Sequence, residues 1–117
     1  MAKKYNFSFS TTDYKEILSD PEVDLVLITT RHDRHAELVV ECLENNKNVF
    51  VEKPLALNAS QLRTIIDAYN TSNGKTLTVG FNRRFSPHSN KAKSLIGNSQ
   101  INVIATMNAG AIPANVW

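Results

Sequence analysis

The stretch VDLVLITT, residues 23–30, decides the fold class of this chain. Its centre, LVLI at residues 25–28, is continuously apolar and contains β-branched side chains. Runs of this kind are typical of strands that are buried on both faces, as in parallel sheets covered by helices. We therefore predict a buried parallel strand here and an α/β fold around it.

After this strand, stretches with helical spacing of apolar residues alternate with short apolar runs. Apolar residues recur at helical spacing between positions 36 and 43, and further apolar runs stand at residues 48–51 (NVFV) and 76–80 (TLTVG). A helix fits between these last two runs, with Asn58 or Ser60 as its N-cap. Three strands separated by two helices predict two βαβ units with right-handed crossovers, and hence a parallel sheet.

For two of the predicted helices the sequence also indicates which residues are buried or which residues cap the helix. The helix after residue 58 has an apolar stripe that we expect to be buried, formed by Leu62, Ile65, Ile66 and Tyr69. A shorter helix near residues 14–18 can be capped by Thr12 or Asp13 and should end before Pro21.

The character of the chain changes after Gly80. Ser86-Pro87 begins a polar helical stretch that Gly97 ends, and the sequence QINVIATMN at residues 100–108 alternates like a strand of a different sheet. We interpret residues up to about 81 as part of a doubly wound domain, and those from 86 onward as the start of another.

Composition excludes several classes of protein. The chain has 117 residues, 42% of them hydrophobic, and a net charge of +2. These values exclude disordered, collagen-like and repeat proteins, and nothing in them demands nucleic acid or a membrane as a partner. The lone Cys42 cannot form an internal disulfide, and the chain has neither a signal peptide nor a membrane-spanning run, so we expect a cytoplasmic protein.

The four glycines, Gly74, Gly80, Gly97 and Gly110, are too far apart to form a phosphate-binding loop. A dinucleotide-binding sheet normally begins with a strand, a Gly-rich turn and a helix, whose backbone approaches the pyrophosphate. The pattern therefore predicts a partial doubly wound sheet that lacks its first strand and Gly-rich turn. Because 117 residues suffice for one core, they also exclude a two-domain enzyme with its active site between the domains.

Lys53 stands directly after the second predicted strand, in VEKPLAL at residues 51–57. Open α/β sheets place ligands at the C-terminal ends of their strands, and a residue before proline has a restricted backbone. A lysine held there beside a nicotinamide is suited to exchange a proton with a substrate hydroxyl. The alternative is a solvated Glu-Lys turn without a catalytic role.

Two more polar segments follow predicted strands. The segment TTRHDRH at residues 29–35 could touch a cofactor, or His35 could simply pack against the strand end. His32 and His35 are spaced like some metal ligands, but no cysteine or carboxylate set completes a site, so we expect no metal. The segment GFNRRFSP at residues 80–87 could bind an anionic substrate, or bind RNA through Arg83, Arg84 and Phe85.

These three strand ends, TTRHDRHA, EKPLAL and GFNRRFSP in that order, resemble the Gfo/Idh/MocA family of NAD(P)-dependent oxidoreductases, which act on sugars and cyclitols. The likeness is greatest to members associated with surface-polysaccharide biosynthesis, and it includes the tail at residues 108–117. It implies that residues 1–85 are the C-terminal part of a Rossmann-like nucleotide-binding domain. Residues 86–117 would then be the first helix and strand of a second, substrate-binding or oligomerisation domain.

The resemblance implies a role for each matching residue. Lys53 would be the catalytic lysine near the nicotinamide, in a turn shaped by Glu52 and Pro54 whose Lys53–Pro54 bond could be cis. Asn82 and Arg83 would approach the substrate. The residues that border NAD or NADP would be Thr29, Thr30, Arg31, His32 and His35, together with Glu52 and Pro54.

The departures from the family pattern shape the functional hypothesis. The phosphate-binding loop is absent, and the family's Asp-x-x-x-His pair would lie beyond Trp117. We therefore expect a piece of a sugar or cyclitol dehydrogenase that has little or no activity alone. The alternative is a non-catalytic module, and because a missing first strand would leave an exposed sheet edge, we expect a homo-oligomer in either case.

Overall fold

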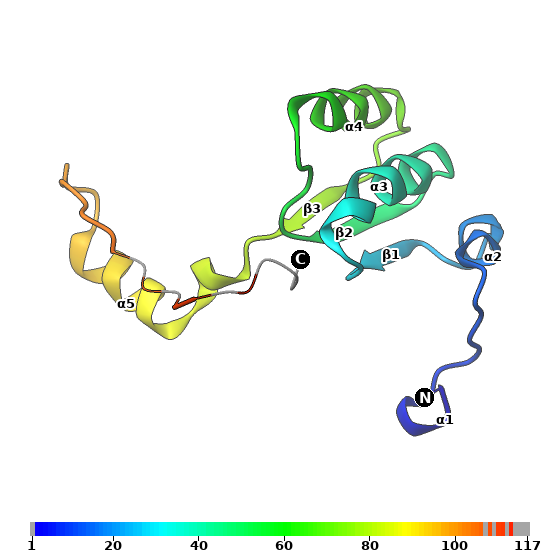
Figure 1. Ribbon diagram of the computed structural model, residues 1–117, viewed down its shortest axis with the longest axis horizontal. Helices are drawn as coiled ribbons and strands as arrows, with labels where there is room; N and C mark the ends of the chain where they lie inside the picture. The colour runs from blue at the N-terminus through cyan, green and yellow to red at the C-terminus, as the bar shows by residue number, and fades with distance from the viewer. Residues whose placement is uncertain (1, 107, 109, 112, 114–117) are drawn as a thin grey trace. The chain divides into compact units, whose positions relative to one another are not determined.

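The computed structural model describes residues 2–106, 108, 110, 111 and 113, and divides the chain into two compact units, Met1–Gly80 and Phe81–Trp117. The first unit contains a three-stranded sheet in the order β1-β2-β3, with both pairs parallel (Figure 1). This confirms the predicted α/β fold with a parallel sheet. Its elements are α1 (Ala2–Tyr5), α2 (Tyr14–Ser19), β1 (Leu25–Ile28), a 3₁₀ turn η1 (His32–Arg34), α3 (His35–Glu44), β2 (Asn48–Glu52), α4 (Ala59–Thr71) and β3 (Leu77–Gly80).

Helix boundaries follow the capping residues. Asp13 accepts a hydrogen bond from the Lys15 backbone N–H at the start of α2, and Asn58 accepts one from Gln61 at the start of α4. The structure thus chooses Asp13 over Thr12 and Asn58 over Ser60. Sequence reasoning did not anticipate α1, a helix of a single turn.

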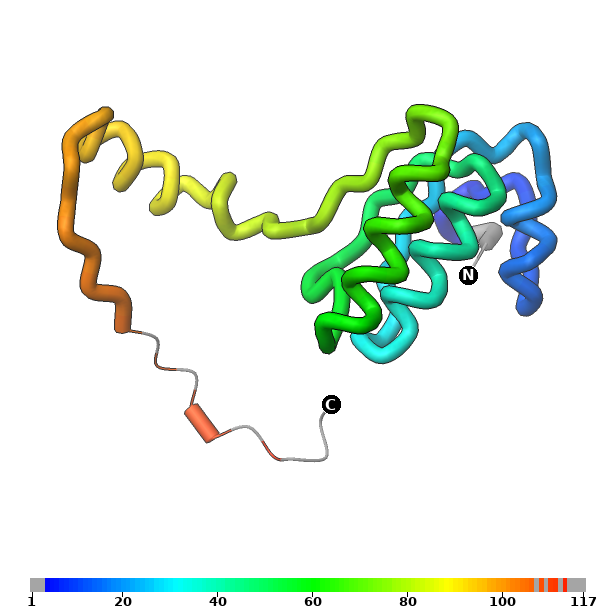
Figure 2. The backbone as a smooth tube through the Cα atoms, turned by 90° about the horizontal axis from the view of Figure 1, so that it is seen from above, coloured from blue at the N-terminus to red at the C-terminus, as the bar shows by residue number. Residues whose placement is uncertain are grey.

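Helices α3 and α4 pack side by side against one face of the sheet (Figure 2). Because side chains alternate along a strand, this face receives Val26 and Ile28 from β1 and their register partners Val49 and Val51 from β2. One hydrophobic core forms there, which also includes Leu18 of α2. The remaining core residues come from α3 and α4: Ala36, Val39, Cys42, Leu43, Ile65 and Ala68.

The opposite face of β1 is not covered, and the prediction of a strand buried on both faces was wrong. Leu25 is 51% exposed and Leu27 is 63% exposed. Both crossover helices lie on the same side, so within the described unit no helix packs over these two leucines. In register beside them lies Phe50 of the central strand, which is half-buried.

The apolar stripe of α4 was also predicted only in part. Of the four residues in the predicted stripe only Ile65 is buried, together with Ala68, which was not predicted. The other three residues of the stripe are exposed: Leu62, Ile66 and Tyr69. The helix meets α3 along a narrow line, so only the residues on that line reach the core.

The second unit contains a 3₁₀ turn, η2 (Asn82–Phe85), and a helix, α5 (Pro87–Ile96). As predicted, Ser86 caps α5 and Gly97 ends it with φ +61°. The strand predicted at 100–108 is absent from the described residues of that segment, 100–106 and 108. A strand needs a partner for its backbone hydrogen bonds, and no described segment pairs with this one. No described helix is long and apolar enough to cross a membrane.

Two adjacent isoleucines provide a test of this packing. Ile65 is 1% exposed and Ile66 is 46% exposed. We expect Ile65→Ala to lower the free energy of unfolding by about 2–5 kcal/mol, and the milder Ile65→Val by about 0.5–1.5 kcal/mol, since each removes buried methyl groups. The control Ile66→Ala should stay within about 0.5 kcal/mol. Urea denaturation measures all three, and equal losses at the two positions would contradict this core.

Candidate functional site

The polar segments after β1 and β2 begin at the same edge of the sheet. Ile28 pairs with Val51 and Glu52 pairs with Gly80, so the three parallel strands end almost level. The loop at residues 29–32 and the turn at residues 53–57 therefore leave the sheet next to each other. This is the edge where open α/β sheets bind their ligands.

The Lys53–Pro54 peptide bond is cis, as predicted. Lys53 is exposed in this turn, whereas Glu52 before it and Pro54 after it are half-buried. The amide of Leu57 closes the turn by donating to the Gln61 side-chain oxygen at 2.8 Å, and Gln61 is in the first turn of α4. Lys53 thus lies in a turn that is held by the Leu57–Gln61 hydrogen bond, and its side chain is accessible from solvent.

His35 connects this turn to the loop after β1. Its ring is fully buried, with Nδ1 2.8 Å from the Pro54 carbonyl oxygen and Nε2 3.0 Å from the Thr30 carbonyl oxygen. The ring of His32 meets it edge-on, with centroids 5.8 Å apart. The structure therefore brings together Thr30, Pro54 and His35 from the predicted cofactor-binding set.

Gly80 at the end of β3 begins the predicted GFNRRFSP segment, but the sequence did not indicate which side chains it packs against. A Cβ atom built there would lie 3.3 Å from the Glu52 carboxylate and 3.3 Å from the Phe50 ring. Glycine lets the end of β3 approach these side chains closely. The signal in the sequence was a glycine ending an apolar run, which also marks a close backbone approach.

Asn82 and Arg83 belong to η2 in the second unit, where both are exposed. Their predicted approach to the substrate remains a prediction. Thr29, Arg31 and Thr30 are exposed on the loop after β1, and their predicted contact with a cofactor also remains a prediction.

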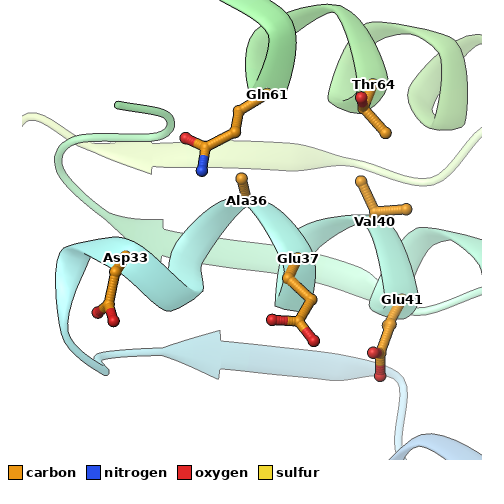
Figure 3. A pocket seen from close by; sticks show the side chains of 7 residues that line it. All are labelled: Asp33, Ala36, Glu37, Val40, Glu41, Gln61 and Thr64. Carbon is orange, nitrogen blue, oxygen red and sulfur yellow. The ribbon is translucent and has the colours of Figure 1, made fainter. Parts of the chain in front are cut away.

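A groove of about 370 Å³ lies between α3 and α4. Ala36 and Val40 point from α3 toward α4, whereas the carboxylates of Asp33, Glu37 and Glu41 point away from α4 (Figure 3). Two of these carboxylates are already engaged: Glu37 pairs with Arg34 at 2.9 Å, and Glu41 accepts a hydrogen bond from Tyr14 at 3.2 Å. Desolvation, and next this hydrogen bond, raise the pKa of Tyr14. Ala36 and Val40 therefore form an apolar floor, and Gln61 and Thr64 line the groove from α4.

Cys42 is a buried core residue, as its position in the α3 stripe indicated. Burial, and next the Glu41 carboxylate, raise the pKa of its thiol to about 11. Within the described part of the chain no three histidine, cysteine or carboxylate side chains are arranged to hold a metal ion.

The fold and this edge of the sheet define a Rossmann-like nucleotide-binding unit. Residues 1–81 match the profile of an oxidoreductase family with an NAD-binding Rossmann fold. The chain belongs to this family, Gfo/Idh/MocA, as the sequence motifs predicted.

Individual relatives agree with this assignment. The chain is 36% identical over 101 residues to a myo-inositol 2-dehydrogenase of Thermotoga maritima, covering 86% of this chain and 30% of that protein. A probable dehydrogenase of Thermotoga maritima superposes with a TM-score of 0.77 at 36% identity, over 84% of this chain and 29% of that one. A levoglucosan dehydrogenase in complex with NADH and levoglucosan superposes with a TM-score of 0.73 at 34% identity, over 81% and 25% of the two chains. This chain thus spans less than a third of each.

The described residues fit a nicotinamide dinucleotide only in part. Polar loops and a lysine stand at the ends of the parallel strands, where such a cofactor lies in this fold. The four glycines do not form a phosphate-binding loop, however, because they lie far apart in the sequence and Gly80 packs against Glu52. The described residues therefore place polar loops and a lysine at the sheet edge, without a Gly-rich cradle for the phosphates.

The thiol of Cys42 provides a prediction about reactivity. With a pKa of about 11, its thiolate fraction at pH 8 is about one hundredth of that at the ordinary value of 9.0. We expect its reaction with a disulfide reagent at pH 8 to be slower by about that factor, and to accelerate as the pH rises toward 11. The unfolded chain in urea is the control, and equal rates in both states would contradict the burial of this thiol.

Proposed function

We propose that this chain is the lysine-bearing part of an NAD(P)-dependent dehydrogenase for a sugar-like or cyclitol alcohol. The observation that carries the proposal is the placement of Lys53, in a cis-proline turn at the ligand-binding edge of the sheet. Membership of an oxidoreductase family supports it, as do the names of the relatives, which include inositol and levoglucosan dehydrogenases.

In this proposal each residue acts on a different part of the reaction. Lys53 in its neutral amine form accepts the proton from the substrate hydroxyl during oxidation, and its ammonium form returns the proton during reduction. Asn82 and Arg83 orient the substrate. A bound nicotinamide supplies the acceptor or donor of the hydride. The cofactor is bordered by Thr29, Thr30, Arg31, His32, Glu52 and Pro54.

The finer parts of the proposal rest on the motifs. The cofactor is NAD or NADP, and the likeness to the polysaccharide-biosynthesis branch supports a sugar-like substrate. The free thiol of Cys42 supports a reducing compartment such as the cytoplasm. Because its residues include no pyrophosphate cradle, we propose that the 117-residue chain has little or no turnover on its own.

A chimera tests this function. The matching segment of the Thermotoga maritima myo-inositol 2-dehydrogenase is replaced by that of this chain, and inositol oxidation is followed by NADH absorbance. We expect the chimera to turn over and the isolated chain to be inactive. Lys53→Met should lower kcat of the chimera about 10²–10⁴-fold, since it removes the proton-transfer group.

The matched control is Lys15→Met, which removes an exposed lysine on α2. It should leave kcat and KM unchanged. A folded Lys53→Met chimera with undiminished kcat would refute the proposed role of Lys53. Turnover by the isolated chain would refute its proposed inactivity.

The second candidate is a non-catalytic module that associates with itself. The exposed leucines of β1 favour it, because β1 is also an edge strand of the sheet. An edge strand offers unpaired backbone groups, and an uncovered apolar face loses hydrophobic stabilisation to water. Two copies that pack these uncovered faces together would bury the leucines, and pairing at the β1 edge would satisfy its backbone groups.

Sedimentation velocity tests the association. We expect the wild-type chain to form a dimer or larger oligomer, and Leu27→Lys to shift it to monomer, because the ammonium would be buried at the contact. Leu62→Lys, at an exposed position on α4, is the matched control and should not change the oligomeric state. A monomeric wild-type chain, or an oligomer that persists in Leu27→Lys, would argue against this surface.

A further inference from the structure

Two polar side chains are buried among the described residues, those of His35 and Lys47. Lys47 precedes β2, and its Nζ donates to the Asp20 carbonyl at 2.6 Å, so it ties α2 to the N-terminal end of the sheet. His35 lies at the opposite end, next to the turn that carries Lys53. Buried polar side chains normally have hydrogen-bond partners, so the partners of the buried His35 ring at this edge of the sheet indicate what it does there.

Both ring nitrogens of His35 face backbone carbonyl oxygens, one from Pro54 and one from Thr30. A carbonyl oxygen can only accept a hydrogen bond. A ring nitrogen that carries a proton donates to the carbonyl oxygen that it faces. The imidazole therefore joins two loops that are separated by more than twenty residues of chain.

The two carbonyls belong to the segments proposed to surround the reacting groups. Pro54 directly follows Lys53, and Thr30 lies in the loop after β1. His35 itself is the first residue of α3, a helix held by the buried side chains of Ala36 and Val39. Through this contact with the Pro54 carbonyl, the ring fixes the lysine turn relative to the start of α3. Because none of the ring is exposed, it is not available to contact a bound cofactor.

We propose that His35 is a positioning residue, which holds the Lys53 turn against the loop at residues 29–32 through the contacts of its buried ring with the Pro54 and Thr30 carbonyls. This differs from its predicted role as a cofactor-binding residue. The inference rests on the proposed function of Lys53, and the experiments below separate the two.

Amide hydrogen exchange tests whether the link holds the turn. The probe is the Leu57 amide, which is bonded to Gln61 and closes the turn. We expect His35→Phe to lower its protection by about tenfold or more, and His35→Gln, which can replace one of the two bonds, to lower it less. The Lys47 amide, bonded to the Cys42 carbonyl at 2.9 Å, should keep its protection.

His88→Phe on α5 makes the same substitution at an exposed histidine and should change neither amide. A uniform loss of protection at Leu57 and Lys47 in His35→Phe would mean that His35 only stabilises the fold. Unchanged protection at Leu57 in His35→Phe and His35→Gln would also refute the positioning role.

Kinetics of the chimera then separate this inference from the proposed function. We expect His35→Gln to lower kcat about tenfold with KM for inositol nearly unchanged, since the lysine is displaced while the substrate contacts remain. If Lys53→Met leaves kcat intact, the function of Lys53 is wrong whatever the exchange data show. If Lys53→Met lowers kcat and His35→Gln does not, the lysine is catalytic and the positioning role of His35 is wrong.

Discussion

The parallel pairing of three successive strands is the constraint on which the rest of this structure depends. Because β1, β2 and β3 follow one another across the sheet, both crossover helices lie on one face, and the strands end together at one edge. The first consequence is a core on one side and exposed leucines on the other. The second is that two loops with polar residues meet at the edge where this fold binds ligands.

His35 lies where the loop after β1 meets the turn after β2, between the carbonyls of Thr30 and Pro54. Parallel pairing places the loop after β1 near the turn after β2, but it does not set their separation. The buried ring of His35 lies between them with a carbonyl oxygen at each nitrogen, and the ring of His32 packs against it edge-on. The described residues include no Gly-rich loop of the kind that cradles a pyrophosphate, so the lysine turn stands at the sheet edge without that feature.

Sequence reasoning succeeded where the signal was local. The Ser86 cap and the polar helix after Pro87 follow from short-range chemistry, which also narrowed the caps of α2 and α4 to two candidates each. The cis Lys53–Pro54 bond was suggested by the family resemblance. It failed where burial depends on distant neighbours. The apolar run at residues 25–28 is typical of a strand buried on both faces, but both helices pack on one face, so Leu25 and Leu27 are exposed on the other. Residues 100–106 alternate like a strand, but find no partner.

The sequence by itself determined the α/β class, the order of the three strands and the helices between them, and the three motifs that carry the family resemblance, because periodicity, capping and turn residues act over a few positions. Only the tertiary structure decided which faces are covered, which residues of the α4 stripe reach the core, and which groups surround the His35 ring. A histidine at the start of a helix is compatible with a ligand contact or with packing. The choice between them depends on the carbonyls of Thr30 and Pro54, which only the folded chain brings to its two nitrogens.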